Sequence, residues 1–106
     1  MPSKYCAALT TTDSLDAANK LASSIVAARL AACVQVVGPI RSFYCWEGRV
    51  NNNEEYQLWA KTSEAKYAEL ETHILAEHSY DVPEIIRLPI TGGSEAYLSW
   101  IDSEVA

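Results

Sequence analysis

The sequence holds few cysteines, few basic residues and no long apolar run. Its three cysteines are far apart and include no CxxC pair, which argues against a zinc ribbon or a ferredoxin-type cluster. Free thiols favour a reducing compartment. The first residues lack the apolar segment and cleavage site of a signal peptide, and no run is long enough to span a bilayer. We therefore expect a cytoplasmic protein without a membrane-spanning segment.

Basic residues are outnumbered, with 8 lysines and arginines against 14 aspartates and glutamates and a formal net charge of −6. Nucleic-acid backbones and anionic membrane surfaces are bound by basic patches, so we expect neither as a partner. Signature motifs of enzymes are missing as well, because the sequence holds no GxSxG, Walker or HExxH motif. We therefore predict a protein that is not an enzyme.

With 106 residues, 49% of them hydrophobic, the chain is predicted to form one domain over residues 1–106. A chain of this size buries roughly 65% of its unfolded surface, which gives a modest core without disulfides or metal. No internal repeat, low-complexity segment or linker interrupts the sequence.

The longest structural pattern covers residues 33–62 and predicts one long β-hairpin. Its β-branched and aromatic residues suit a pleated, packed surface. Gly48 is the best turn residue between the two strands, and the asparagines at 51–53 are an alternative tip. Gly38-Pro39 predicts a bend in the outgoing strand, because proline donates no ladder hydrogen bond. The distal part of the hairpin should then reach beyond the core of its own subunit.

Both faces of this hairpin are apolar. Period-two alternation puts Phe43, Cys45, Leu58 and Ala60 on one side, and Tyr44, Trp46 and Trp59 on the other. A sheet covered on one side only would alternate apolar with polar residues. We therefore infer that another copy of the chain covers the second face. A sheet buried on both faces within one subunit is the alternative.

The remaining segments carry further strand and helix patterns. Strands are predicted at residues 4–10 and 84–89, and helices at residues 14–31, 64–77 and from Ser94 onward. The order β-α-β-β-α-β plus a C-terminal helix predicts an α+β fold, in which an antiparallel four-stranded sheet carries both main helices on one face. The other face then stays bare, which is a second reason to expect oligomerisation.

Several segments resemble the CutA divalent-cation tolerance family. They are AACV at 31–34, Pro39, SFYCWEGRV at 42–50, Lys61-Thr62, HSYDVPEI at 78–85 and YLSWI at 97–101. The likeness covers nearly the whole chain in the family's order; Ser79 departs from it, because the family commonly has proline there. It implies a ferredoxin-like subunit in a compact homotrimer similar to the PII signalling proteins, and a role in tolerance of copper and other metals.

The resemblance also implies a metal site, which this chain keeps only in part. Some family members have cysteine at the position of Thr10 and a second histidine at that of Glu77, whereas this chain keeps only His78. Copper selects soft thiolate and imidazole, so Thr10 is a poor ligand. We expect His78 with Glu77 to bind Cu²⁺ weakly, and we expect no required cofactor. Alternatively, His78 only closes the second helix.

A second candidate site combines a lysine and a glutamate with aromatic side chains, the usual composition of a small-ligand pocket. In a fold like that of the family, five such residues come near inter-subunit clefts: Trp46, Lys61, Tyr80, Glu84 and Trp100. The alternative function is therefore a PII-like sensor or scaffold whose cleft binds a small anion or metabolite. In the opposing interpretation the aromatics fill the interface and Lys61 pairs with Glu55 or Glu84.

Overall fold

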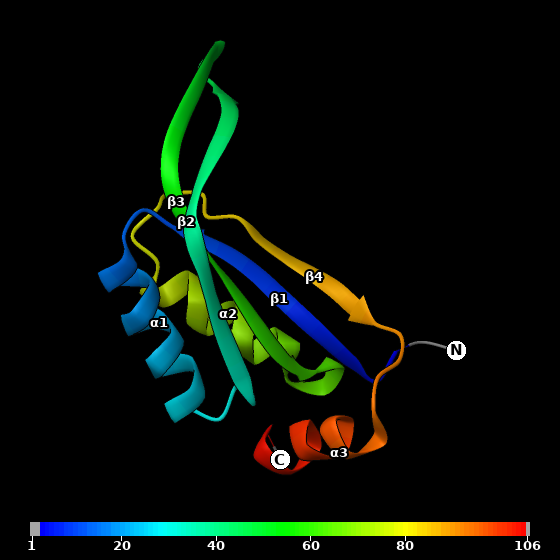
Figure 1. Cartoon of the computed structure of the whole chain (residues 1–106). Helices are drawn as coiled ribbons and strands as arrows, with labels where there is room; N and C mark the ends of the chain where they lie inside the picture. The colour runs from blue at the N-terminus through cyan, green and yellow to red at the C-terminus, as the bar shows by residue number, and fades with distance from the viewer. Residues whose placement is uncertain (1–2, 106) are drawn as a thin grey trace.

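The computed structural model describes residues 3–105; the other three residues of the predicted domain lie outside the described part. Its elements are, in chain order, β1 (Tyr5–Thr12), α1 (Leu15–Ala27), β2 (Cys33–Trp46), β3 (Arg49–Ser63), a 3-10 turn (Glu64–Lys66), α2 (Tyr67–Glu77), β4 (Ile85–Ile90) and α3 (Glu95–Val105). The strands form one antiparallel sheet in the order β2-β3-β1-β4. Helices α1 and α2 cover one face of this sheet (Figure 1). The predicted ferredoxin-like order with an extra C-terminal helix is confirmed.

The core lies between the two helices and the sheet. Helix α1 buries residues spaced three and four apart, namely Ala18, Leu21 and Ile25, and α2 buries Tyr67, Leu70 and Ile74. They pack against inward-facing strand residues, chiefly Cys6, Ala8, Leu58 and Ala60. Small residues on the strands and on α1 let the helices approach the sheet closely.

Helix α1 begins as predicted but ends earlier. Ser14 is its N-cap, and its hydroxyl accepts a hydrogen bond from the N–H of Ala17 at 3.1 Å. The prediction that the helix runs to residue 31 is wrong. Arg29 adopts a left-handed φ of 60°, and Leu30 N–H donates back to the carbonyl of Ile25, which is a Schellman ending. A continued helix would have turned Leu30 away from the core, whereas this ending buries it.

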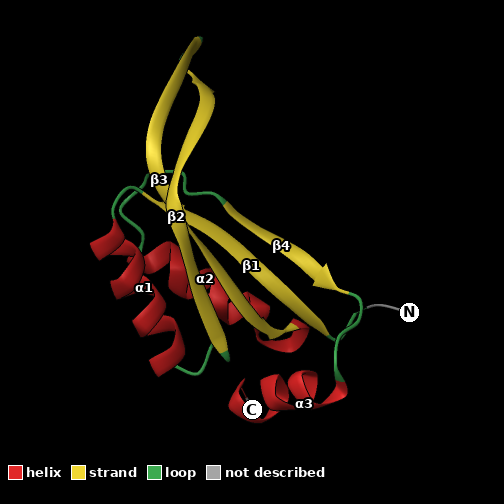
Figure 2. Ribbon diagram, viewed as in Figure 1, coloured by secondary structure: helices red, strands yellow, loops and turns green. Residues whose placement is uncertain are grey.

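The β2–β3 hairpin is the most extended feature of the molecule and rises beyond the rest of the sheet (Figure 2). Its turn is Glu47-Gly48, where both residues have positive φ, 52° and 76°. This pair forms the two-residue turn that matches the twist of antiparallel strands, so the tip lies at Gly48 rather than at 51–53. The strand register shifts between Val37 and Ile40, where the bend at Gly38-Pro39 was predicted.

The face of the sheet opposite α1 and α2 is largely uncovered in one chain. Ile86 and Leu88 of β4 and Val37 of β2 are exposed there. On the hairpin, apolar side chains are exposed on both sides, including Phe43 and Trp46, which are 69% and 55% exposed. The predicted bare face and two-faced hairpin are thus present. The chain leaves these large apolar residues without a cover of its own.

Other predicted boundaries need small corrections. The second helix does not begin as α-helix at Glu64: residues Glu64–Lys66 form a 3-10 turn, capped by Ser63, before α2 starts. Strand β1 runs two residues further than predicted, because Thr11 and Thr12 still pair with β3. Strand β4 is shifted by one residue to Ile85–Ile90.

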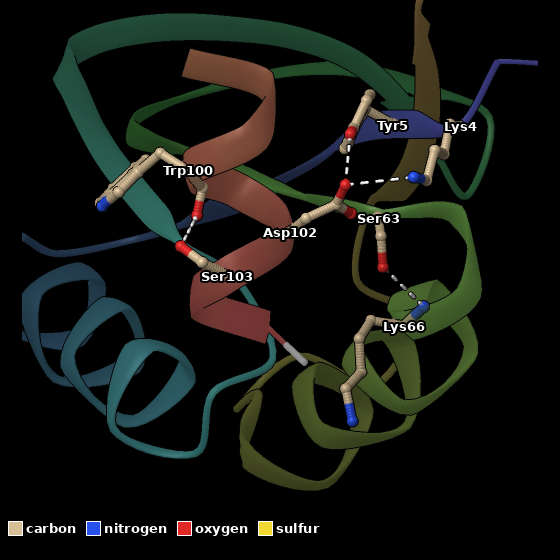
Figure 3. Close-up of polar contacts among 7 residues, drawn as sticks. All are labelled: Lys4, Tyr5, Ser63, Lys66, Trp100, Asp102 and Ser103. Carbon is tan, nitrogen blue, oxygen red and sulfur yellow. Dashed lines mark hydrogen bonds and ion pairs between the residues drawn. The ribbon is translucent and has the colours of Figure 1, made fainter. Parts of the chain in front are cut away.

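Helix α3 packs against the end of the sheet that lies away from the hairpin tip (Figure 1). The carboxylate of Asp102 accepts hydrogen bonds from the hydroxyl of Tyr5 at 2.6 Å and from Nζ of Lys4 at 3.1 Å (Figure 3). These two donors lower the pKa of Asp102, and the same contact raises the pKa of Tyr5. The Trp100 ring projects from α3 on the side away from Asp102.

Across residues 3–105, no helix has the length and apolar character needed to cross a membrane.

Candidate functional site

A cleft of about 670 Å³ opens between the distal part of the hairpin, the end of β1 and the segment that leads into β4. Its aromatic lining consists of Phe43, Tyr44, Trp46 and Tyr80. Its acidic lining consists of Asp13, Glu55, Asp81 and Glu84. A cavity of this size and composition is within the range that holds small organic ligands.

Tyr80 and Glu55 form the polar centre of this cleft. The hydroxyl of Tyr80 donates a hydrogen bond to Oε2 of Glu55 at 2.8 Å. Burial raises the pKa of Tyr80 well above its usual value, and the hydrogen bond to Glu55 raises it further. The phenol therefore stays protonated at physiological pH and remains a donor. Glu55 itself is only 8% exposed, although it lies on a surface cleft.

His78 fixes the segment that carries Tyr80. The N–H of Tyr80 donates to Nδ1 of His78 at 3.1 Å, and Nε2 of His78 lies 2.7 Å from the carbonyl oxygen of Thr11. A backbone N–H can only donate, so Nδ1 must be the accepting nitrogen and Nε2 carries the proton. The imidazole is therefore neutral in this arrangement. His78 also caps α2, since its own N–H donates to the carbonyl of Ile74 at 2.9 Å.

These contacts bear on the metal site that the resemblance implies. Both ring nitrogens of His78 already form hydrogen bonds, so a metal ion would have to displace the Tyr80 amide from Nδ1. Glu77 is exposed and free to turn toward solvent. Thr10 is buried, and its hydroxyl has no hydrogen-bond partner within residues 3–105. In the same range, no three His, Cys, Asp or Glu side chains converge on one point.

Within one chain, three of the five predicted cleft residues come together; that all five lie near clefts between subunits stays a prediction. Trp46, Tyr80 and Glu84 line the cleft. Lys61 lies on β3 opposite Ala7 and Cys33, and Trp100 lies on α3 at the far end of the sheet (Figures 1 and 3).

The suggested ion pair of Lys61 with Glu55 does not form within one chain. The two residues are six positions apart on the same extended strand, which is roughly 20 Å. Glu55 bonds to Tyr80 instead.

Sequence reasoning missed most of the acidic lining. Asp13 and Asp81 were not among the predicted site residues, yet both line the same cavity as Glu55 and Glu84. The available signal was the pair of acids that directly follows Tyr80 in DVPE and the acids that end the NNNEE segment of β3. Nothing local in the sequence shows that these segments meet. The result matters because an acidic lining disfavours the small anion that was expected as ligand.

The three cysteines differ sharply in environment. Cys6 is fully buried, and burial raises the pKa of its thiol from 9.0 to about 12. Cys33 is half-buried, and Cys45 is exposed on the distal hairpin. Cys45 is therefore the thiol that solvent metal ions and oxidants reach first.

Comparison with known proteins gives a consistent result. The family model described as CutA1 divalent ion tolerance protein matches residues 6–104. Protein CutA, chloroplastic, of Arabidopsis thaliana is 51% identical over 86 residues, which are 81% of this chain and 47% of that protein. The divalent-cation tolerance protein CutA of Pectobacterium atrosepticum is 39% identical over 88 residues, covering 83% of this chain and 80% of the relative. The chain spans about half the length of the plant relatives that it matches.

Solved structures agree with the fold. The crystal structure of CutA1 from Oryza sativa superposes with a TM-score of 0.95 at 40% identity, covering 99% of this chain and 96% of that one. The periplasmic divalent cation tolerance protein CutA from Archaeoglobus fulgidus gives a TM-score of 0.93 at 36% identity, covering 96% and 99% of the two chains.

Proposed function

The chain belongs to the CutA1 divalent ion tolerance family, and from that premise we propose that it protects its cell against excess divalent cations, copper foremost, as a homotrimer that catalyses no reaction. The family match over residues 6–104 supports the tolerance role. So do bacterial and archaeal relatives that carry the name divalent-cation tolerance protein.

One observation carries the proposed assembly: the apolar sheet face and hairpin that a single chain leaves uncovered. Large exposed apolar patches on a protein surface mark interaction sites. Ile86, Leu88 and Val37 are exposed in one chain, and the hairpin extends away from the body of the molecule (Figure 1). Three copies around an axis would cover these faces with each other, in the closed symmetry that homo-oligomers favour.

Sedimentation equilibrium tests this assembly. The wild type should sediment with three times the mass of the chain, and its melting temperature should rise with protein concentration. Leu88→Asp places a charge on the uncovered face and should give a smaller species. The control is Leu75→Asp, because Leu75 is also an exposed leucine but lies on α2. A monomeric wild type at micromolar concentration would discard the trimer.

We further propose that Cu²⁺ binds weakly at Glu77 and His78. The two residues supply one carboxylate and one imidazole, and the imidazole must first release the amide of Tyr80 from Nδ1. Losing that hydrogen bond offsets part of the binding free energy, which explains why the site should be weak. When bound, the copper ion would supply only a positive charge and a ligand-binding position to this surface.

Calorimetric titration with Cu²⁺ tests the site. The titration should use a Cys45→Ser background, because the exposed thiol competes for copper. His78→Ala and Glu77→Gln should each weaken binding, whereas His73→Ala on α2 should not. Equal affinities of wild type and His78→Ala would discard this site.

A growth assay tests the cellular role. A bacterial strain that lacks its own CutA should grow poorly in raised copper, and this chain should restore growth. The Leu88→Asp variant should restore it less well if the assembled form is the active one. Identical growth with and without the chain would remove the tolerance role.

For the compartment, we propose the cytoplasm, on the basis of three cysteines that form no disulfide within the described residues. Relatives differ here, since the plant proteins are named chloroplastic and the archaeal structure periplasmic. Cell fractionation with an antibody against the chain distinguishes these locations.

A second candidate function is a small-molecule sensor or scaffold, and the 670 Å³ cleft is the observation that favours it. A thermal-shift screen with nucleotides, carboxylates and amines tests it. Stabilisation by any of them supports a sensor, and its complete absence counts against one.

A further inference from the structure

We propose that the cleft between the distal part of the hairpin and the segment before β4 binds a small organic cation, an amine or a quaternary ammonium compound. The inference rests on the second candidate function, ligand binding in the cleft, and names the class of ligand. It is independent of whether the chain confers metal tolerance.

The charge of the lining selects a cation. Asp13 precedes α1, Glu55 lies on β3, and Asp81 and Glu84 lie before β4, so three separate segments each bring acid to one cavity. No lysine, arginine or histidine is among the residues that line it. Walls of one charge sign concentrate ions of the opposite sign. An anionic ligand would meet four formal negative charges and no counter-charge.

Glu55 gives the second, independent observation. Its side chain is more than nine-tenths buried, and the contact made by its carboxylate is the neutral hydroxyl of Tyr80. The four ion pairs within residues 3–105 involve other carboxylates, on Asp102, Glu104, Glu69 and Glu64. A buried carboxylate normally has a cationic partner, because its removal from water is costly. A bound cation would supply the partner that the chain itself does not.

The aromatic walls and the volume select an organic cation rather than a bare metal ion. Tyr44, Trp46 and Tyr80 line the cavity, and the first two remain substantially exposed. Aromatic faces attract ammonium groups through the ring quadrupole, with tryptophan the strongest, but carry no donor atoms for a metal. The cavity of about 670 Å³ is many times the roughly 30 Å³ that one water molecule occupies in the liquid. It is therefore large enough for an organic cation and much larger than a bare metal ion needs.

Calorimetric titration of the assembled wild-type protein tests this assignment. Choline and agmatine are the cationic probes, dimethylbutanol is the uncharged isostere of choline, and succinate is the anionic probe. Choline should bind at least about tenfold more tightly than dimethylbutanol, because only choline gains the cation–π and carboxylate attractions. Raised salt should weaken the binding of choline.

Three variants locate the binding. Glu55→Gln keeps an acceptor for Tyr80 and removes the charge, and it should weaken choline binding by about fivefold or more. Trp46→Leu should do the same through lost cation–π contact. Trp100→Leu is the matched control, because Trp100 is a comparably exposed tryptophan outside the cleft. Should Trp46→Leu fail to assemble, Glu84→Gln replaces it.

Several results would overturn the proposal. Equal affinities for dimethylbutanol and choline would show that the cleft binds through apolar contact and does not recognise positive charge. Binding of succinate alone would keep a sensor but reverse the charge of its ligand. No binding of any probe, with Glu55→Gln changing the sedimenting mass, would show that a lysine or arginine of another subunit already fills the cleft.

Discussion

The backbone N–H of Tyr80 donates a hydrogen bond to Nδ1 of His78 at 3.1 Å, and the two rings lie 4.7 Å apart. Nε2 of the same imidazole reaches the carbonyl of Thr11 at 2.7 Å. His78 thus ties the end of β1 to the segment before β4. Because Tyr80 in turn holds Glu55, this histidine positions one wall of the cleft.

Replacing His78 by alanine should therefore loosen that wall. Two hydrogen bonds through the imidazole are lost, and we expect the free energy of unfolding to fall by about 1–2 kcal/mol. The N–H of Tyr80 should exchange with solvent faster, which NMR hydrogen exchange measures directly. Glu77→Ala, at the exposed neighbouring position, is the control. Unchanged exchange at Tyr80 in His78→Ala would contradict this positioning role.

A pair of threonines gives the second prediction. The hydroxyl of Thr10 is buried without a partner within the described residues, whereas the equally buried hydroxyl of Thr62 donates to the carbonyl of Leu30 at 2.7 Å. Thr10→Val should raise the free energy of unfolding by about 1 kcal/mol, because an unsatisfied polar group is replaced by a methyl group of similar shape. Thr62→Val should lower it by about 1–3 kcal/mol, because the Leu30 carbonyl loses its partner. Urea unfolding compares the two, and a loss of stability in both variants would count against the unsatisfied hydroxyl.

Sequence patterns predicted the elements of this fold well, because each depends on neighbours along the chain. The turn at Gly48 and the start of the last helix at Ser94 are local chemistry, and the structure confirms them. The end of α1 was mispredicted, because Ala28 and Ala32 continue the helical spacing while the burial of Leu30 against the core decides the geometry.

The cleft was predicted only in part, for a related reason. Glu55 and Tyr80 are 25 residues apart in sequence and meet only after the sheet forms. Of the five predicted residues, Trp46, Tyr80 and Glu84 share this cleft, whereas within one chain Lys61 and Trp100 lie at the other end of the sheet. A sequence shows which residue types are available, whereas the sheet register decides which of them share a cavity.

Alkaline pH should destabilise the protein through Cys6 and Tyr67. Burial raises the pKa of Cys6 from 9.0 to about 12, and burial together with a hydrogen bond to Glu71 raises the pKa of Tyr67 from 10.0 to about 12. Above pH 9 the unfolded chain therefore loses protons that the folded chain retains, so stability falls with rising pH up to about pH 12. The part due to Cys6 is about 1 kcal/mol by about pH 10.

Urea unfolding at a series of alkaline pH values measures this slope. Cys6→Ala should flatten it between pH 9 and about 10, whatever its effect on stability at neutral pH. Cys45→Ala should leave the slope unchanged, because Cys45 is exposed. If the slope of Cys6→Ala matches that of the wild type, the thiol of Cys6 ionises as easily in the folded chain as in the unfolded one.

The last prediction concerns Gly38, at the bend of the hairpin. A Cβ atom at this position would lie 2.6 Å from Cδ2 of Tyr56, 3.1 Å from the carbonyl oxygen of Glu55 and 3.2 Å from Cα of Tyr56. The side chain of Tyr56 can rotate, but the two backbone atoms can move only if the strand pairing shifts. Gly38→Ala should therefore lower the free energy of unfolding by about 1–3 kcal/mol, as overpacking does. Gly92→Ala is the control, because a Cβ there meets nothing within 4 Å.

A double-mutant cycle separates the two parts of this clash. Tyr56→Ala removes the ring that the new methyl group would meet first, so combining it with Gly38→Ala should cost less than the sum of the single changes. Whatever penalty remains belongs to the backbone atoms of Glu55 and Tyr56. The remaining penalty also predicts that the strand shifts at Glu55, so Gly38→Ala should weaken the hydrogen bond from Tyr80. Faster hydrogen exchange of the Tyr80 N–H in Gly38→Ala, but not in Gly92→Ala, would show that the bend and the cleft are coupled. Strictly additive changes in the free energy of unfolding would show that the ring of Tyr56 does not contact the new methyl group.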